Sequence, residues 1–208
     1  MPVYSADNLG RVLPGFEEIG RRFDRQMDVV MARVLPGEYY VSMLEECIVT
    51  VLGSCISVCV RDPYSNIGGM NHFMLPESEQ GHWAGTAASA TTRYGNYAME
   101  HLINQLLSHG AARNSLEIKV FGGGNVLKGG ANVGTRNIEF VEKYMKSEGY
   151  RIAAKDVGGD NPRKLLYFPL SGKVLLKHLR TSDDLIQQET SYRNTIETEQ
   201  EGGEIDLF

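Results

Sequence analysis

The sequence predicts an α/β protein, a layered sandwich of mixed β-sheets with two main helices packed outside. Apolar runs typical of strands and patterns typical of helices follow one another in the order strands, helix, strand, helix, strands. This order differs from the regular strand–helix alternation of a doubly wound sheet. The chain has 208 residues, 42% of them hydrophobic, which suffices for one domain with a substantial core and short extensions.

The first half of the domain is expected to consist of strands. Its apolar residues alternate or run together in four short segments bounded by turn-forming residues. A turn at Asp62-Pro63 and Ser65-Asn66 separates the last two segments. The predicted strands are EYYVSM (38–43), ECIVTVL (46–52), ISVCVRD (56–62) and MNHFML (70–75).

The second half is expected to contain both helices and the remaining strands. A broad apolar face predicts a helix over residues 93–108, and Gly110 follows where helices often end. A second helix is predicted over residues 133–147, with Asn132 as its N-cap. Further strands are predicted at LEIKVF (116–121), YRIAAKDVGG (150–159), KLLYFPL (164–170) and KVLLKHL (173–179).

Residues 1–34 and 181–208 are interpreted as extensions of a central domain over residues 35–180. Residues 181–208 carry eight acids and one base, a composition typical of a solvated, disordered tail. Because residues 202–208 are apolar and acidic, a second hypothesis is that they dock on a partner. The first extension is expected to be partly helical, from apolar residues at spacings of three and four: Phe16, Ile19, Phe23, Met27 and Val30.

The composition also excludes several functional classes. No run reaches the about 20 apolar residues that span a bilayer, and no charged-then-apolar leader opens the chain. A cytoplasmic protein that is not membrane-inserted is therefore expected. Three cysteines without CxxC spacing argue against a disulfide framework or a zinc ribbon. The sequence has no basic stripe with interleaved aromatic residues, so nucleic acid is not an expected partner.

The candidate chemistry lies between Ile48 and Pro76, where Cys55 and His72 interrupt apolar strand-like runs beside glycines. A neighbouring imidazole converts a thiol into a thiolate nucleophile, so the pair predicts cysteine-dependent acyl chemistry. Gly53 and Ser54 offer a bend whose backbone N–H groups can form an oxyanion hole. Gly69 is a further candidate for backbone support. Cys47 and Cys59 lie within uninterrupted strand patterns and are interpreted as core packing.

The same segment resembles the CheD family of chemoreceptor glutamine deamidases. The resemblance rests on a strand threonine, LGSC (52–55), a DP turn, a GG pair, a histidine and MLP (74–76). It continues through VFGGGNVL (120–127), NVGTRN (132–137) and DVGGDNPRKLLYFPLSGKVLLKHL (156–179), and so covers about residues 35–180.

The resemblance implies a nucleophile, a base and a third member, which fall on Cys55, His72 and Thr50. The assignment of Thr50 as the third member depends on the strand register, because a slip of one residue turns a side chain to the other face of the sheet. The implied reaction converts glutamine side chains of methyl-accepting chemotaxis receptors to glutamate, with no metal or organic cofactor. The implied fold is an α/β sandwich, and a CheC-type phosphatase is an implied partner.

The residues alone leave two alternative functions open. One is a cysteine amidase, esterase or protease with another substrate, and another is a binding module that docks on receptors or a phosphatase without catalysis. The run GGGN (122–125) suggests a phosphate cradle, but it lacks the Lys-Ser/Thr ending of a P-loop, so tight packing under the active site is favoured. His82 is a second candidate base, in a predicted surface loop over residues 77–90 that could form a lid.

Overall fold

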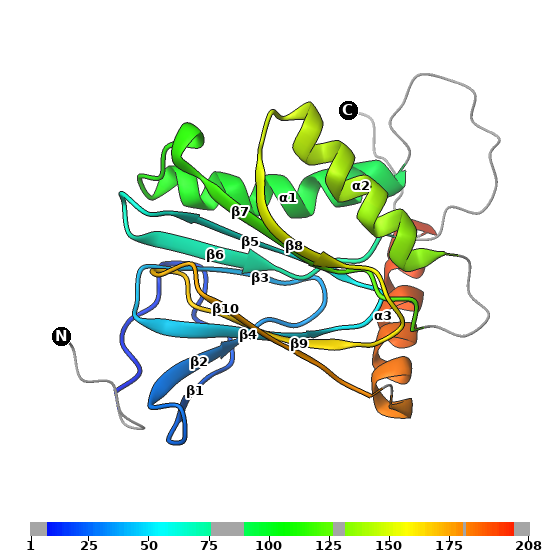
Figure 1. Cartoon of the computed structure of the whole chain (residues 1–208), viewed down its shortest axis with the longest axis horizontal. Helices are drawn as coiled ribbons and strands as arrows, with labels where there is room; N and C mark the ends of the chain where they lie inside the picture. The colour runs from blue at the N-terminus through cyan, green and yellow to red at the C-terminus, as the bar shows by residue number, and fades with distance from the viewer. Residues whose placement is uncertain (1–7, 76–89, 127–131, 181, 202–208) are drawn as a thin grey trace.

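The computed structural model describes residues 8–75, 90–126, 132–180 and 182–201. These residues form two five-stranded sheets and a helical layer, stacked as sheet, sheet and helices (Figure 1). The apolar residues buried between the layers belong to a single core cluster. The predicted α/β sandwich of mixed sheets is therefore confirmed.

The first sheet has the strand order β1-β2-β4-β9-β10. Its central strand β4 pairs in parallel with β2 and antiparallel with β9, so Thr50 lies opposite Leu165. The strands are β1 (Arg21–Asp24), β2 (Val29–Arg33), β4 (Glu46–Leu52), β9 (Arg163–Tyr167) and β10 (Val174–His178).

The second sheet has the order β3-β6-β5-β7-β8, with β5 at its centre. Only β7 and β8 run parallel, and the other neighbours are antiparallel. The strands are β3 (Tyr39–Ser42), β6 (Ile67–Asn71), β5 (Ile56–Asp62), β7 (Glu117–Gly122) and β8 (Ile152–Val157). The chain passes from β4 in the first sheet directly into β5 in the second, and residues 53–55 make this crossing.

Two helices, α1 (Ala90–Ser108) and α2 (Val133–Ser147), cover the outer face of the second sheet (Figure 1). Both were predicted from their apolar faces, which supply buried residues such as Met99, Leu102 and Val141. Asn132 does occupy the N-cap position of α2, but its side chain makes no capping hydrogen bond. Within the described residues, no helix is long and apolar enough to cross a membrane.

The predicted N-terminal helix is wrong, because the segment forms the hairpin β1–β2. Asp24 accepts backbone N–H bonds from Gln26 and Met27, and Asp28 has a φ of 53°, so the chain turns where a helix would continue. The β-branched pair Val29 and Val30 then extends as β2 alongside β4. Strand pairing with a distant segment outweighs the local helical spacing.

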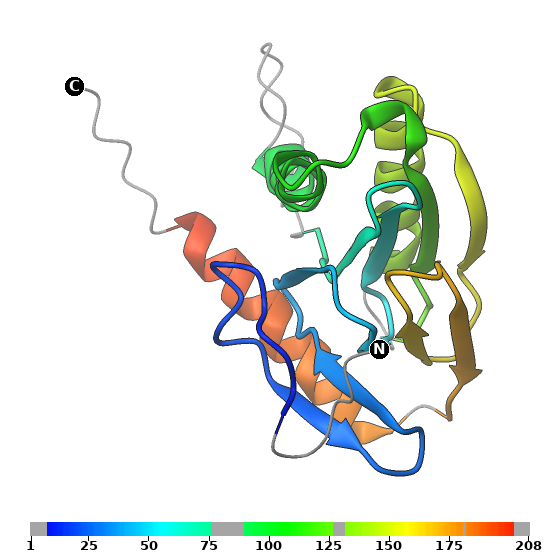
Figure 2. The same cartoon turned by 90° about the vertical axis from the view of Figure 1, so that its left-hand side faces the viewer.

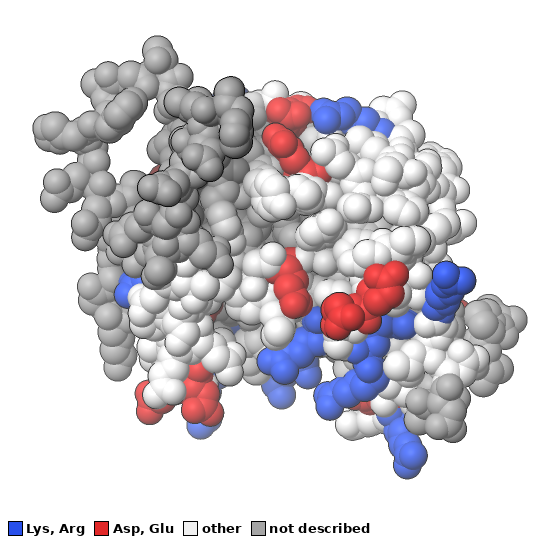
Figure 3. All heavy atoms as spheres, turned by 180° about the vertical axis from the view of Figure 1, so that it is seen from behind, with Lys and Arg blue, Asp and Glu red and all other residues white. Residues whose placement is uncertain are grey.

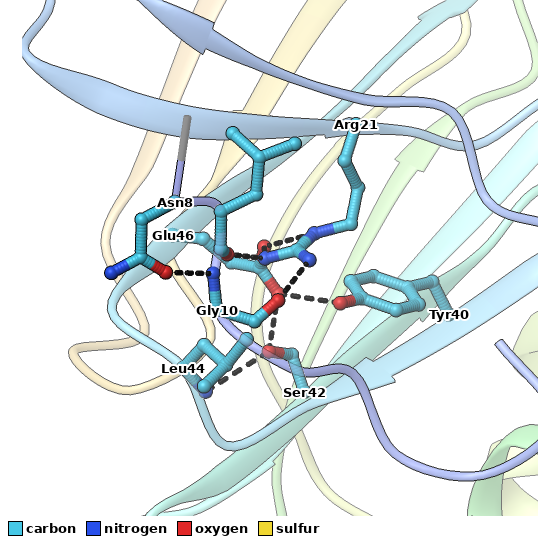
Figure 4. Close-up of polar contacts among 8 residues, drawn as sticks. Asn8, Gly10, Arg21, Tyr40, Ser42, Leu44 and Glu46 are labelled. Atoms are coloured by element: carbon cyan, nitrogen blue, oxygen red, sulfur yellow. Dashed lines mark hydrogen bonds and ion pairs between the residues drawn. The ribbon is translucent and has the colours of Figure 1, made fainter. Parts of the chain in front are cut away.

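A buried carboxylate on β4 binds the β1–β2 hairpin to the rest of the domain. Glu46 on β4 forms an ion pair of 2.8 Å with Arg21 of β1 and accepts hydrogen bonds from the hydroxyls of Tyr40 (2.6 Å) and Ser42 (Figure 4). The Arg21 guanidinium also donates to the carbonyl of Gly10 at 2.8 Å. This cluster joins the N-terminal segment, β1, β3 and β4.

The predicted disordered tail is also wrong over most of its length, because residues Asp183–Glu201 form a third helix, α3. Figures 1 and 2 show α3 at one end of the sandwich, beside the ends of both sheets. The prediction relied on the polar, acidic composition of the tail. It overlooked side chains at helical spacing that are buried or half-buried in the structure, namely Leu185, Glu189, Tyr192 and Ile196. Residues 202–208 and the loop with His82 lie outside the described residues.

Charged side chains of both signs share the molecular surface. On the face drawn in Figure 3, Lys and Arg gather in the lower part with Asp and Glu beside them. This mixture of signs differs from the continuous basic stripe of a nucleic-acid interface.

Candidate active site

Cys55 and His72 lie on neighbouring segments of the second sheet. A bridge joins the residues that follow them, with Ile56 N donating to Phe73 O (2.8 Å) and Phe73 N donating to Ile56 O (2.9 Å). In this antiparallel register Cys55 and His72 point to the same face and are diagonal neighbours, for which Cα atoms lie about 7–8 Å apart. The two residues predicted as a pair, 17 positions apart in sequence, thus lie on the same face of neighbouring segments, and no hydrogen bond joins His72 Nε2 to the thiol among the described residues.

Thr50 reaches His72 from the first sheet. Its Oγ1 lies 2.8 Å from His72 Nδ1 and also donates to Val34 O at 2.8 Å. The single hydroxyl proton of Thr50 is donated in the hydrogen bond to Val34 O, so Oγ1 can only accept a hydrogen bond from Nδ1–H. The imidazole is therefore protonated on Nδ1, and Nε2 carries the free lone pair. The register of β4 therefore turns Thr50 toward the imidazole, which the sequence alone left open.

The free nitrogen of His72 faces the interior of the site. Nε2 is buried and has no hydrogen-bond partner among the described residues. A small cavity of about 40 Å³ lies between β4, His72 and α3, and Thr50, Leu185 and Glu189 are among its lining residues. A neutral imidazole in this tautomer is positioned to accept a proton on Nε2.

The crossing residues 53–55 form a cradle of backbone N–H groups, because each of their carbonyls is tied back to other elements. Gly124 N donates to Gly53 O (2.7 Å), Asn137 Nδ2 donates to Ser54 O (2.8 Å) and Gly123 N donates to Cys55 O (2.7 Å). With the carbonyls fixed on one side, the N–H groups point to the other. The predicted oxyanion hole at Gly53 and Ser54 therefore has the geometry of an anion site.

The run GGGN packs directly under this cradle. A side chain at Gly122, whose φ is +112°, would overlap the carbonyl oxygen of Cys55. The interpretation of these glycines as tight-packing elements is confirmed for Gly122 and Gly124, which lie against the carbonyls of Cys55 and Gly53. Gly69, by contrast, lies within β6, where an added Cβ would come 2.6 Å from the carbonyl oxygen of Tyr40. It serves close packing of β6 on β3 at some distance from the cradle.

The cradle is occupied by a side chain that sequence reasoning missed. Glu189 of α3 accepts hydrogen bonds from Gly53 N (2.8 Å), Ser54 N (2.9 Å) and Ser54 Oγ (2.7 Å), and Cys55 N lies 3.5 Å away. Glycine is needed for this approach, since a Cβ on Gly53 would come 2.6 Å from Glu189 Oε1. No sequence signal marked Glu189, which was one acid among eight in a polar tail.

Asn137 was missed as well, and it connects the two reactive segments. Its Nδ2 holds Ser54 O next to the nucleophile, while its Oδ1 accepts Leu75 N, three residues after His72, at 2.8 Å. The residue is completely buried in the first turns of α2. An asparagine inside a helix has no distinctive sequence pattern, but this one fixes the relative position of Cys55 and His72.

Burial controls the protonation of both reactive groups in this structure. Desolvation raises the pKa of the Cys55 thiol well above its usual value, and the charge and hydrogen bond of Glu189 raise it further. Desolvation lowers the pKa of His72 to about 3, against a smaller opposing contribution from the carbonyl of Val34. At neutral pH the site therefore holds a neutral thiol and a neutral imidazole.

Comparison with known proteins gives a consistent result. Residues 74–178 match the family model described as CheD chemotactic sensory transduction, a segment that begins two residues after His72. A Hahella chejuensis protein named "Probable chemoreceptor glutamine deamidase CheD" is 50% identical over 198 residues, covering 94% of this chain and 93% of that protein. A Herminiimonas arsenicoxydans protein of the same name is 51% identical over 190 residues, covering 89% of this chain and 93% of that protein.

A solved Neisseria meningitidis structure of family DUF152 has a TM-score of 0.38 and 9% identity, covering 65% of this chain and 64% of that chain. This likeness is too low to support an argument about fold or function.

Proposed function

The chain belongs to the CheD family of chemotactic sensory transduction, and on that premise we propose that it is a chemoreceptor glutamine deamidase with Cys55 as its nucleophile. The observation that supports the proposal is the occurrence of three features on neighbouring segments of the chain. They are the thiol of Cys55, the free Nε2 of His72 fixed by Thr50, and the amide cradle of residues 53–55.

The reaction begins with proton transfer. His72 Nε2 takes the proton of the Cys55 thiol, and the thiolate attacks the side-chain carboxamide carbon of a glutamine. The carbonyl oxygen becomes an oxyanion and accepts N–H bonds from the cradle, each donor contributing about 3 kcal/mol in comparable sites. Thr50 supports the imidazolium by accepting a hydrogen bond from Nδ1–H.

The intermediate then collapses in two steps. His72 returns the proton to the departing nitrogen, so the C–N bond breaks, ammonia leaves and a thioester with Cys55 remains. Water, deprotonated by His72, attacks the thioester carbon and the C–S bond breaks. The imidazolium returns its proton to the departing thiolate, and the carboxylic acid product ionises to glutamate. The residues in place supply each proton transfer in this sequence.

The substrate follows from the relatives' names, which specify chemoreceptors. The proposed substrates are glutamine side chains on the cytoplasmic part of methyl-accepting chemotaxis receptors, so the protein would act in the cytoplasm. A CheC-type phosphatase remains a partner predicted from the family resemblance.

Intact mass spectrometry tests the proposal. A receptor cytoplasmic fragment carrying glutamines is incubated with the protein or with Cys55→Ala, and each deamidation adds about 1 Da as NH₂ becomes OH. A gain with the native protein alone supports the deamidase and its nucleophile. A receptor fragment that gains no mass, although the protein binds it, would favour the binding-module hypothesis.

A further inference from the structure

The group in the amide cradle comes from the chain itself and has the chemistry of a reaction product. Deamidation of a glutamine leaves a glutamate, and Glu189 is a glutamate presented by a helix. Its carboxylate accepts hydrogen bonds from the N–H groups of Gly53 and Ser54, the N–H of Cys55 lies 3.5 Å away, and its charge raises the pKa of the Cys55 thiol. A side chain from α3 thus occupies the place that the proposed mechanism gives to the substrate's reacting group.

We propose that α3 is an internal inhibitor of the site, with Glu189 bound as a product-like carboxylate that must leave before a substrate glutamine enters. The identity of the displaced substrate rests on the proposed deamidase function. The closure itself rests on the contacts of α3 with residues 53–55.

The cradle in this form fits a carboxylate better than a carboxamide. Both oxygens of Glu189 act as acceptors, Oε1 for Gly53 N and Oε2 for Ser54 N and Ser54 Oγ. A carboxamide has one acceptor and one donor, so its NH₂ group would face one of these N–H donors. The closed state is therefore selective for the charged, product-like side chain.

With α3 in place, the reactive groups are closed to substrate. Cys55 is 0% exposed and His72 is 3% exposed. The cavity beside His72 and Glu189 measures about 40 Å³, whereas pockets that bind ligands usually exceed about 300 Å³. In the described part of the protein, Glu189 occupies the amide cradle that a glutamine on another protein would have to enter.

The described part of α3 is mostly exposed or half-buried. Of its side chains in the described part, only Glu189 and Ile196 are buried, and the hydroxyl of Tyr192 meets that of Tyr94 on α1 at 2.6 Å. The remaining described positions are half-buried or exposed. A helix that packs through one face against the end of the sandwich can be displaced by a competing helix without unfolding the two sheets.

Withdrawal of α3 also changes the reactivity of the nucleophile. Burial and the Glu189 carboxylate both raise the pKa of the Cys55 thiol, and the contribution of the carboxylate is removed when the helix leaves. Opening therefore grants access and favours the thiolate at the same time, so inhibition by α3 acts on binding and on chemistry.

Alkylation of Cys55 tests this inference without any receptor. The full-length protein, Glu189→Ala and the control Gln187→Ala, an exposed position on the same helix, are treated with iodoacetamide. Labelling of each cysteine is followed by peptide mass spectrometry. Because charged hydrogen bonds hold the closed state, Cys55 in Glu189→Ala is expected to react at least about tenfold faster than in the wild type. Gln187→Ala should react at the wild-type rate.

Glu189→Asp serves as a second variant, because it keeps the negative charge but shortens the side chain by one methylene. An intermediate alkylation rate is expected, since the carboxylate no longer reaches both N–H groups. Equal Cys55 rates, within twofold, in all four proteins with cooperative thermal unfolding would overturn the inference.

The receptor assay separates this inference from the proposed function. If Cys55 reacts faster in Glu189→Ala but no variant adds mass to the receptor fragment, α3 closes the site and the deamidase proposal fails. If the wild type and Glu189→Ala deamidate the fragment at equal rates and alkylate equally, the deamidase stands and the inhibitor role is overturned.

Discussion

Two glutamates are buried among the described residues, Glu46 at 1% exposure and Glu189 at 3%. Glu46 is balanced by the guanidinium of Arg21 and by two hydroxyls (Figure 4). Glu189 has no ion-pair partner within the described part of the chain, and its acceptors are filled by backbone N–H groups and the Ser54 hydroxyl.

The difference separates a structural carboxylate from a ligand-like one. A buried charge with a matched cation is part of the fold, and removing one partner leaves the other uncompensated. A carboxylate on backbone N–H groups beside a nucleophile occupies a site whose donors serve an oxyanion during catalysis. Changes around Glu46 should therefore alter stability, and changes around Glu189 should alter activity.

The largest effect is expected where Glu189 meets the nucleophile. Cys55→Ala removes the acyl-enzyme route, so receptor deamidation should fall by at least about 10³-fold. Because alanine fills most of the buried space, cooperative unfolding should be retained. Initial rates by intact mass and thermal melts by circular dichroism measure both quantities. Residual activity above 10% of the wild type would remove Cys55 from the nucleophile role.

At the Glu46 cluster the effect should appear in stability. Arg21→Met leaves Glu46 buried without its cation, and the free energy of unfolding should fall by about 3 kcal/mol. Deamidation per folded molecule should stay unchanged. Arg113→Met is the matched control, because its ion pair with Glu148 is exposed and should contribute nothing measurable. Equal urea midpoints for the two variants would contradict the structural role of the Arg21–Glu46 pair.

The closed site also predicts a pH dependence. The pKa of His72 is lowered to about 3 in the folded state, against about 6.5 for an unfolded chain. The unfolded state therefore binds a proton first as the pH falls. Stability from this group is present above about pH 6.5 and is lost toward pH 3, at about 1.4 kcal/mol per pH unit.

The contribution of His72 is isolated by subtraction. Between pH 4 and 6, the slope of the free energy of unfolding against pH should be smaller in His72→Asn than in the wild type. The expected difference is about 1.4 kcal/mol per pH unit, the contribution of one bound proton. Urea unfolding at several pH values gives both slopes. Identical slopes would show that His72 is not held neutral by burial.

The smallest effect is expected at Thr50, which acts through His72. Thr50→Val keeps the shape but removes the acceptor for Nδ1–H, so kcat should fall about tenfold. Thr50→Ser retains the hydroxyl and should keep most of the activity. A change in the acidic limb of the kcat–pH profile in Thr50→Val, absent in Thr50→Ser, would mark a positioning role, whereas equal profiles would leave Thr50 with packing alone.

Local patterns predicted part of the candidate site. Cys55 and His72 stand beside glycines at breaks in strand runs, and such breaks are visible along the chain. The two helices over residues 93–108 and 133–147 were equally visible, because their apolar faces repeat within one segment. The candidate reacting groups and the two helices were therefore predictable from the sequence.

The features that only the tertiary structure decided depend on contacts between segments that are distant in sequence. The helical spacing near the N-terminus gave way to β1 and β2 because β2 pairs with β4. The face of Thr50 followed from the register of β4, and Asn137 gained its role from meeting Ser54, 83 residues away.

Glu189 shows the same limit most clearly. It is separated from Ser54 by 135 positions, and in sequence it is one acid in a polar segment. Its role arises because the sheets bring three N–H groups to one end of the sandwich and α3 lies across that end. The sequence by itself determined which groups can react, and the packing of distant elements decided which carboxylate faces them.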